Sequence, residues 1–289
     1  MTAGQVASGR AVIRAADPSD IADIRRILAA HDSDGPVTTV DIVGPYVAHL
    51  IDHHRAKVSE LDGAVVAFGA VVDAGVSVHL ADLFVRADLL GRGLGRPLLA
   101  SLFGDARRRT TFASDDPRAL PVYVRAGMNP LWVSLYLEGA AKTLPRPPAT
   151  LDLEPANPVR LAALELAWTG ADRGVDHAFW ASLAEADPFV VAERGDPVAF
   201  GYARARQVSP VRVLDRFVVR PGADPVPPTL AALRRAGRDG CVYAAVQGPS
   251  PVLRRLLDLG FVVRDRDQYM ASEPGLIDPA RRIPNGGML

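Results

Sequence analysis

The sequence predicts an α/β protein built from two copies of one mixed unit in tandem. Alternating apolar runs, typical of strands, alternate along the chain with longer segments of helical period. A length of 289 residues suits two domains of ordinary size. Short segments also recur at a separation of about 132–140 residues. They are Val66–Gly69 with Val198–Gly201, Asp82–Val85 with Asp215–Val218, and Ala126–Met128 with Leu259–Phe261.

The repeat divides the chain into three parts. Copy one covers residues 1–138 and copy two covers residues 151–289 with a tail at its end. Residues 139–150 contain three prolines and form the predicted linker. The tail from Glu273 to Leu289 is expected either to reach the functional cleft or to be a disordered end.

The elements of copy one follow from apolar runs and the residues that interrupt them. Asp17 and Pro18 end a first strand and cap a helix. The apolar stretch 63–80 is broken by Asp73 and by glycines, so it predicts two strands and no membrane span. The predicted order is strand 10–15, helices 18–30 and 40–54, strands 55–60, 64–72 and 77–85, helix 96–108, strand 110–114, helix 118–126 and strand 131–138.

A glycine-rich segment lies between the strand that ends at Val85 and the helix that begins near Arg96. Gly91, Gly93 and Gly95 occupy alternate positions there. Glycine takes positive φ and lets a ligand approach the backbone. A row of backbone N–H groups beside a helix N-terminus is suited to pyrophosphate.

Two common phosphate-binding motifs do not fit this segment. A dinucleotide fingerprint needs a third glycine where this chain has Leu98. A P-loop needs Gly-Lys-Ser/Thr, and no lysine is near.

The segment resembles the acyl-CoA loop of the GCN5-related N-acetyltransferases (GNAT family), Arg/Gln-x-x-Gly-x-Gly/Ala. Leu90–Gly95 matches both glycines and departs at Leu90. The family also carries Asn-x-x-Ala-x-x-x-Tyr-x-x-x-Gly-Phe downstream. Here Asp116 replaces Asn, Tyr123 and Gly127 match, and Met128 replaces Phe. The resemblance spans about residues 10–138.

The resemblance implies roles for the matching positions. The backbone of Leu83, Phe84 and Val85 would hold the pantetheine and thioester, and Asp116 would be a further cofactor contact. Tyr123 would protonate the leaving thiolate, because a phenol pKa near 10 is close to that of a thiol. The pyrophosphate would be held by Gly91, Arg92, Gly93, Leu94, Gly95 and Arg96, with the two arginines adding charge.

His79 and Asp82, both on the strand that ends at Val85, are the residues considered for the base. Some relatives place a carboxylate at the position of His79, and the pKa of histidine suits proton transfer. A hydrogen-bonded structural histidine is the alternative. Asp82 falls on the opposite face by strand alternation, and its recurrence as Asp215 indicates a structural role.

Copy two has lost these features. Its loop positions hold Asp224, Val226 and Pro228 in place of the three glycines, and Leu256 replaces Tyr123. Proline has no N–H to donate, and a carboxylate repels phosphate. Copy two is therefore expected to keep the fold without binding acyl-CoA, to pack against copy one and to help wall the acceptor pocket.

Composition excludes several function classes. The formal net charge is zero, which gives no support to nucleic-acid or membrane binding. Cys241 is the single cysteine, so no internal disulfide or cysteine-based zinc site is expected, and no metal site is predicted. The start of the chain lacks a signal-peptide apolar region. A cytoplasmic monomer or homodimer is expected.

Together these features predict an N-acetyltransferase. It would transfer an acetyl group from acetyl-CoA to a primary amine of a small molecule or peptide. The alternative is an acyl-CoA-binding sensor or a non-catalytic partner-binding module, which would need the glycines but not Tyr123.

Overall fold

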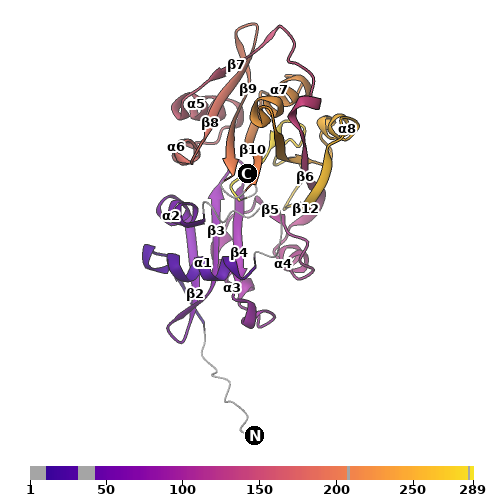
Figure 1. Cartoon of the computed structure of the whole chain (residues 1–289). Helices are drawn as coiled ribbons and strands as arrows, with labels where there is room; N and C mark the ends of the chain where they lie inside the picture. Colours follow the sequence, from indigo (N-terminus) through magenta and orange to yellow (C-terminus); the bar gives the residue numbers. More distant parts are fainter. Residues whose placement is uncertain (1–10, 32–42, 207–208, 286) are drawn as a thin grey trace. The chain divides into compact units, whose positions relative to one another are not determined.

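The computed structural model describes residues 11–31, 43–206, 209–285 and 287–289 (Figure 1). The chain divides into two compact units. Unit 1 consists of residues 1–71 and 82–105, and unit 2 consists of residues 72–81 and 106–289. Strands β3 (Ala64–Asp73) and β4 (Val78–Val85) each pass from one unit to the other.

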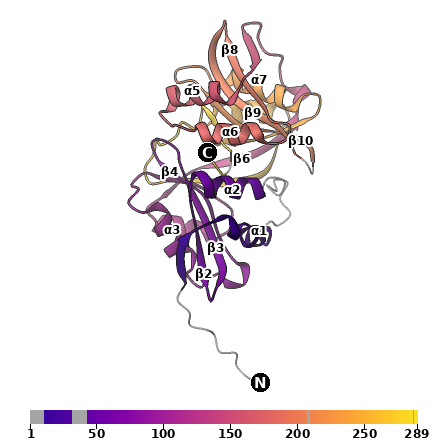
Figure 2. The same cartoon turned by 90° about the vertical axis from the view of Figure 1, so that its left-hand side faces the viewer.

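Unit 1 is a small antiparallel sheet with helices on both faces. β1 (Val12–Ala15) pairs with β2 (Arg55–Leu61), and β2 pairs with β3. Asp17 caps the first helical turn, which leads into α1 (Ile21–Ala29). α1 and α2 (Val43–His53) lie on one face, and α3 (Gly95–Phe103) lies on the other (Figure 2).

Basic residues of β2 fix the C-terminal end of α3. The Arg55 guanidinium donates to the Leu102 carbonyl oxygen at 2.8 Å, and Lys57 Nζ donates to Ser101 Oγ at 2.6 Å. The helix ends at Phe103, earlier than the predicted residue 108, because Gly104 takes a φ of +51°.

Unit 2 contains a larger mixed sheet. From β4 onward the strands lie in the order β4-β5-β12-β6-β11-β10-β9-β8-β7, and β13 pairs with β10. The pairs β4–β5 and β10–β11 are parallel, as expected where a helix connects the two strands. The strands are β5 (Arg109–Ala113), β6 (Asn129–Ala140), β7 (Leu151–Pro155), β8 (Asp187–Glu193), β9 (Asp196–Arg206), β10 (Ser209–Val219), β11 (Cys241–Gln247), β12 (Val262–Ala271) and β13 (Arg282–Ile283).

The two sequence copies exchange their last long strands within this sheet. β12 of copy two pairs with β5 of copy one, where Gln268 lies opposite Ala113. β6 of copy one pairs with β11 of copy two, where Tyr136 lies opposite Ala245. β6 and β12 also pair with each other. Neither copy therefore completes its own sheet.

Because of this exchange, the compact units are divided differently from the two sequence copies. β6 runs to Ala140, into the predicted linker at 139–150, and is built into unit 2. A sequence repeat locates similar segments and does not reveal which copy a strand pairs with.

The helices of unit 2 cover both faces of its sheet. α5 (Pro158–Thr169) and α6 (Gly174–Ser182) lie on one face of β8–β10, and α7 (Val226–Gly237) lies on the other (Figures 1 and 2). α7 and α8 (Pro251–Asp258) pack on an apolar core that includes Leu137, Phe217 and Leu233. No helix in the described residues is long and apolar enough to span a membrane.

The predicted elements of copy one are confirmed in kind and order. Most of their ends differ from the prediction by one or two residues. The stretch 63–80 is two strands, as expected. Residue 10 and residues 40–42 lie outside the described residues.

Candidate active site

The glycine loop of copy one has the backbone that its sequence predicts. Gly91 and Gly93 both have a φ of +79°, a backbone conformation in which residues other than glycine are strained. A Cβ added at either position would meet nothing within 4 Å, so the loop is open on that side. Gly95 begins α3, and a Cβ there would lie 3.5 Å from Val85 Cγ2.

The loop and the first turn of α3 present unpaired N–H groups. Leu94 caps the helix without a side-chain hydrogen bond. Among the described residues, the N–H groups of Gly93, Leu94, Gly95 and Arg96 have no hydrogen-bond partner. Arg92 and Arg96 are exposed on the same segment. Open donors, a helix N-terminus and two cations fit a pyrophosphate.

The strand segment before the loop lies in the same unit. Leu83, Phe84 and Val85 end β4 and are partly buried. His31 Nε2 is 2.7 Å from the Val85 carbonyl oxygen, and its ring contacts Phe84 at a centroid distance of 5.5 Å. The Val85 carbonyl is thus already engaged by a side chain that the sequence did not single out.

Tyr123 and Asp116 belong to unit 2, at the helix that follows β5. Tyr123 is buried in α4 (Ala119–Arg125), and its carbonyl accepts from Met128 N at 3.1 Å. Gly127 has a φ of +83°, which accounts for the matched glycine after the tyrosine. The Asp116 carboxylate forms an ion pair with Arg118 at 2.7 Å and accepts from Arg118 N, so it shapes the start of α4.

His79 also belongs to unit 2 and is fully buried. Its Nδ1 lies 3.0 Å from Thr110 Oγ1, and its Nε2 has no partner among the described residues. Burial, with the nearby charges of Arg173 and Arg216, lowers the pKa of His79 to about 3. A histidine with this pKa stays neutral at physiological pH and is a weak proton acceptor.

The carboxylate of Asp82, in unit 1, has a raised pKa, whereas that of His79 is lowered. The Tyr46 hydroxyl in α2 donates to Asp82 Oδ2 at 2.8 Å. Burial raises the pKa of Asp82 to about 6, although the Tyr46 hydrogen bond opposes that shift. The recurrence of Asp82 as Asp215 predicts a structural role for both, but their partners differ: Asp82 accepts from Tyr46, and Asp215 accepts from Arg204.

In copy two the corresponding strand backbone is paired with the chain's own C-terminal segment. Shifting Phe84 and Val85 by 133 residues gives Phe217 and Val218. These residues pair with Ile283 and Arg282 of β13. The tail is therefore built into unit 2, and Leu276, Ile277 and Leu289 pack with Tyr269.

The loop of copy two presents no comparable donors. Pro227 and Pro228 lie in the first turn of α7 and have no N–H. Val226 N donates to Asp224 Oδ1 at 3.0 Å, so a carboxylate stands at the helix start. Leu256 takes the place of Tyr123, and its carbonyl accepts from Phe261 N at 3.0 Å, as Tyr123 accepts from Met128. Copy two keeps the local backbone and lacks the donors.

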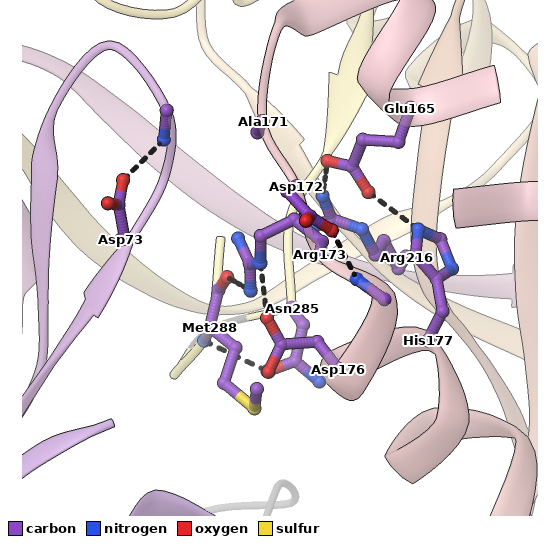
Figure 3. Close-up of polar contacts among 12 residues, drawn as sticks. Asp73, Glu165, Ala171, Asp172, Arg173, Asp176, His177, Arg216, Asn285 and Met288 are labelled. Carbon is purple, nitrogen blue, oxygen red and sulfur yellow. Dashed lines mark hydrogen bonds and ion pairs between the residues drawn. The ribbon is translucent and has the colours of Figure 1, made fainter. Parts of the chain in front are cut away.

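A buried polar network in copy two was not foreseen from the sequence (Figure 3). Glu165 accepts from Arg216 and lies 2.8 Å from His177 Nε2. Arg173 pairs with Asp176 and donates to the Met288 carbonyl at 2.8 Å. Burial alone would raise the pKa of Glu165, but Arg216 and His177 hold it well below its usual range. These charged residues are not spaced at a regular interval along the sequence, so only the structure shows that they lie together.

Comparisons with known proteins agree with this fold. Residues 27–128 match the model of the Acetyltransferase (GNAT) family. A Pyrococcus horikoshii structure is similar over 100% of this chain and 98% of its own, with 14% identity and a TM-score of 0.68. A GCN5-related N-acetyltransferase from Anabaena variabilis ATCC 29413 covers 96% of this chain and 84% of its own, with 13% identity and a TM-score of 0.63.

A tandem protein is among the similar structures. The tandem GNAT protein from the clavulanic acid biosynthesis pathway matches over 92% of this chain and 100% of its own, with 16% identity and a TM-score of 0.61. No curated protein sequence gives a significant match.

Residues 27–128 therefore form a domain of the GNAT acetyltransferase family, and the chain has the fold of tandem GNAT proteins. The predicted fold class is confirmed, and the predicted family is confirmed for this domain.

Proposed function

We propose that the chain is an acyl-CoA-dependent N-acyltransferase whose chemistry is carried by copy one. Acetyl-CoA would donate the acetyl group, and a primary amine of a small molecule or peptide would accept it. The observation that carries the proposal is the row of unpaired N–H groups from Gly93 to Arg96, beside glycines at positive φ.

The residues present suit acyl-CoA. The open N–H groups, with Arg92 and Arg96, would hold the pyrophosphate, and the end of β4 would hold the pantetheine and thioester. When bound, the thioester supplies an activated acyl carbon. Tyr123 would give its phenolic proton to the sulfur that leaves, which is the role its position in the family motif implies.

Copy two would bind no acyl-CoA. Its loop has prolines and a capping carboxylate, and β13 pairs with the backbone that corresponds to Phe84 and Val85. The contrast between the copies favours one acyl-CoA per chain.

An assay of thiol release tests the proposed function. Purified full-length protein and acetyl-CoA would be incubated with panels of primary amines, and the products identified by mass. Amine-dependent thiol release with a matching acetylated product supports the proposal. Acetyl-CoA binding with no transfer to any amine class would favour a sensor.

A further inference from the structure

We propose that Asp82, oriented by Tyr46, accepts the proton of the acceptor amine in copy one. The inference rests on the proposed function and assigns one step of it to a residue. Asp82 lies in β4 directly before Leu83–Val85, the segment expected to hold the thioester. Its side chain is therefore anchored on the strand that would carry the reacting group.

The Asp82 carboxylate has one engaged oxygen and one free oxygen. Oδ2 accepts the Tyr46 hydroxyl at 2.8 Å. Oδ1 has no hydrogen-bond partner among the described residues. It is also absent from the set of fully buried side-chain atoms that lack a partner. Tyr46 is itself fixed in α2 with its side chain buried. A carboxylate held at one oxygen and open at the other can receive a proton in a defined direction.

The matching aspartate of copy two shows what a structural role looks like. Asp215 Oδ2 accepts from Arg204 Nε at 3.1 Å in a largely buried ion pair. The position of copy one that corresponds to Arg204 holds Val72. Asp82 has no cationic partner in the part of the chain that the structure describes. The carboxylate of copy two is thus occupied by an arginine, whereas that of copy one accepts only from a neutral hydroxyl among the described residues.

The hydrogen bond to Tyr46 shows which way the Asp82 side chain points. Tyr46 lies in α2, so the carboxylate of Asp82 faces that helix.

The ionisation of Asp82 suits proton acceptance. Burial raises its pKa to about 6 from an ordinary value of 3.8, and the hydrogen bond from Tyr46 lowers it only in part. At neutral pH the group remains an anion with a higher proton affinity than an exposed aspartate. A base with a pKa near the working pH is the more effective one.

The amine nitrogen bonds to the thioester carbonyl carbon while its proton passes to the Asp82 carboxylate. The C–S bond then breaks, and the sulfur takes a proton from Tyr123. The products are the amide and the free thiol, and transfer of one proton from Asp82 to Tyr123 through solvent restores both groups.

The test is the pH–rate profile of full-length Asp82→Asn and Tyr46→Phe with acetyl-CoA and an accepted amine. For Asp82→Asn we expect kcat to fall roughly 10²–10⁴-fold and the acidic limb near pH 6 to disappear, with acetyl-CoA affinity unchanged. Tyr46→Phe removes a hydrogen bond to the charged carboxylate. The pKa of Asp82 should rise, and the limb should move to higher pH.

Asp215→Asn is the matched control, and it should leave the profile of kcat unchanged. If Asp82→Asn keeps the acidic limb and the rate while the wild type transfers acetyl groups, the base lies elsewhere and only this inference is overturned. If the wild type transfers no acetyl group to any amine, the proposed function falls and the assignment of Asp82 falls with it.

Discussion

Ile283 pairs with Phe217 across antiparallel strands, and Phe217 corresponds to Phe84 of copy one. The backbone that would bind pantetheine in copy one is thus bonded in copy two to the chain's own C-terminal segment. Copy two has lost the loop glycines, and β13 pairs with the strand that precedes this loop. Both changes affect the region that would bind acyl-CoA in copy one. Together they support a chain with one acyl-CoA site.

Gly95→Val should weaken acetyl-CoA binding without disturbing the fold. The family motif accepts glycine or alanine at this position, so a larger side chain is needed to obstruct the ligand. The new Cβ would meet Val85 Cγ2 at 3.5 Å, which is an ordinary contact, and the two further methyl groups would crowd the open loop where the pyrophosphate would lie. Hydrogen bonds to a charged group are worth about 1.5–3 kcal/mol each, so losing one predicts a fall in affinity of roughly tenfold or more.

Calorimetric titration of Gly95→Val with acetyl-CoA measures this effect. Asp224→Ala, at the corresponding loop of copy two, is the control and should bind as the wild type does. Equal affinity in Gly95→Val and the wild type would remove the loop from the binding site.

Tyr123→Phe should lower the rate and spare binding. The ring is kept and the proton donor is lost, so kcat is expected to fall roughly 10²–10⁴-fold where chemistry limits turnover. Tyr243→Phe is a suitable control, because its hydroxyl has no partner among the described residues. An unchanged kcat in Tyr123→Phe would exclude it as the acid.

His79→Gln should leave the acidic limb of the pH–rate profile in place. The sequence predicts that His79 titrates near its ordinary pKa, but burial and two arginines lower that pKa to about 3. Protonation of His79 would then occur well below the working range. Loss of the limb near pH 6 in His79→Gln, with Asp82 intact, would restore His79 as the base.

A fragment of residues 1–145 should not fold as the full chain does. It would leave β5 without β12 and β6 without either neighbour, which exposes unpaired strand edges. Circular dichroism and size-exclusion chromatography should show aggregation or loss of structure. A soluble, cooperatively unfolding fragment would show that the strand exchange is dispensable.

Local patterns in the sequence predicted much of the fold and one part of the site. Gly91 and Gly93 were foreseen because a positive φ restricts residue type, and the structure gives both the expected conformation. The element order of copy one follows from apolar periodicity. These features depend on near neighbours in the chain, so they can be read from the sequence.

Features that depend on distant pairing could not be predicted. The exchange of β6 and β12 leaves no local signal, and the predicted boundaries therefore differ from the compact units. The shifted pKa of His79 depends on Arg173 and Arg216, which are far away in sequence. The Tyr46–Asp82 bond likewise joins residues 36 positions apart.

The most direct test of the central claim is a calorimetric titration of the full-length protein with acetyl-CoA. The account predicts one site per chain, with affinity lost in Gly95→Val and retained in Asp224→Ala. Two sites per chain, or no binding at all, would contradict it.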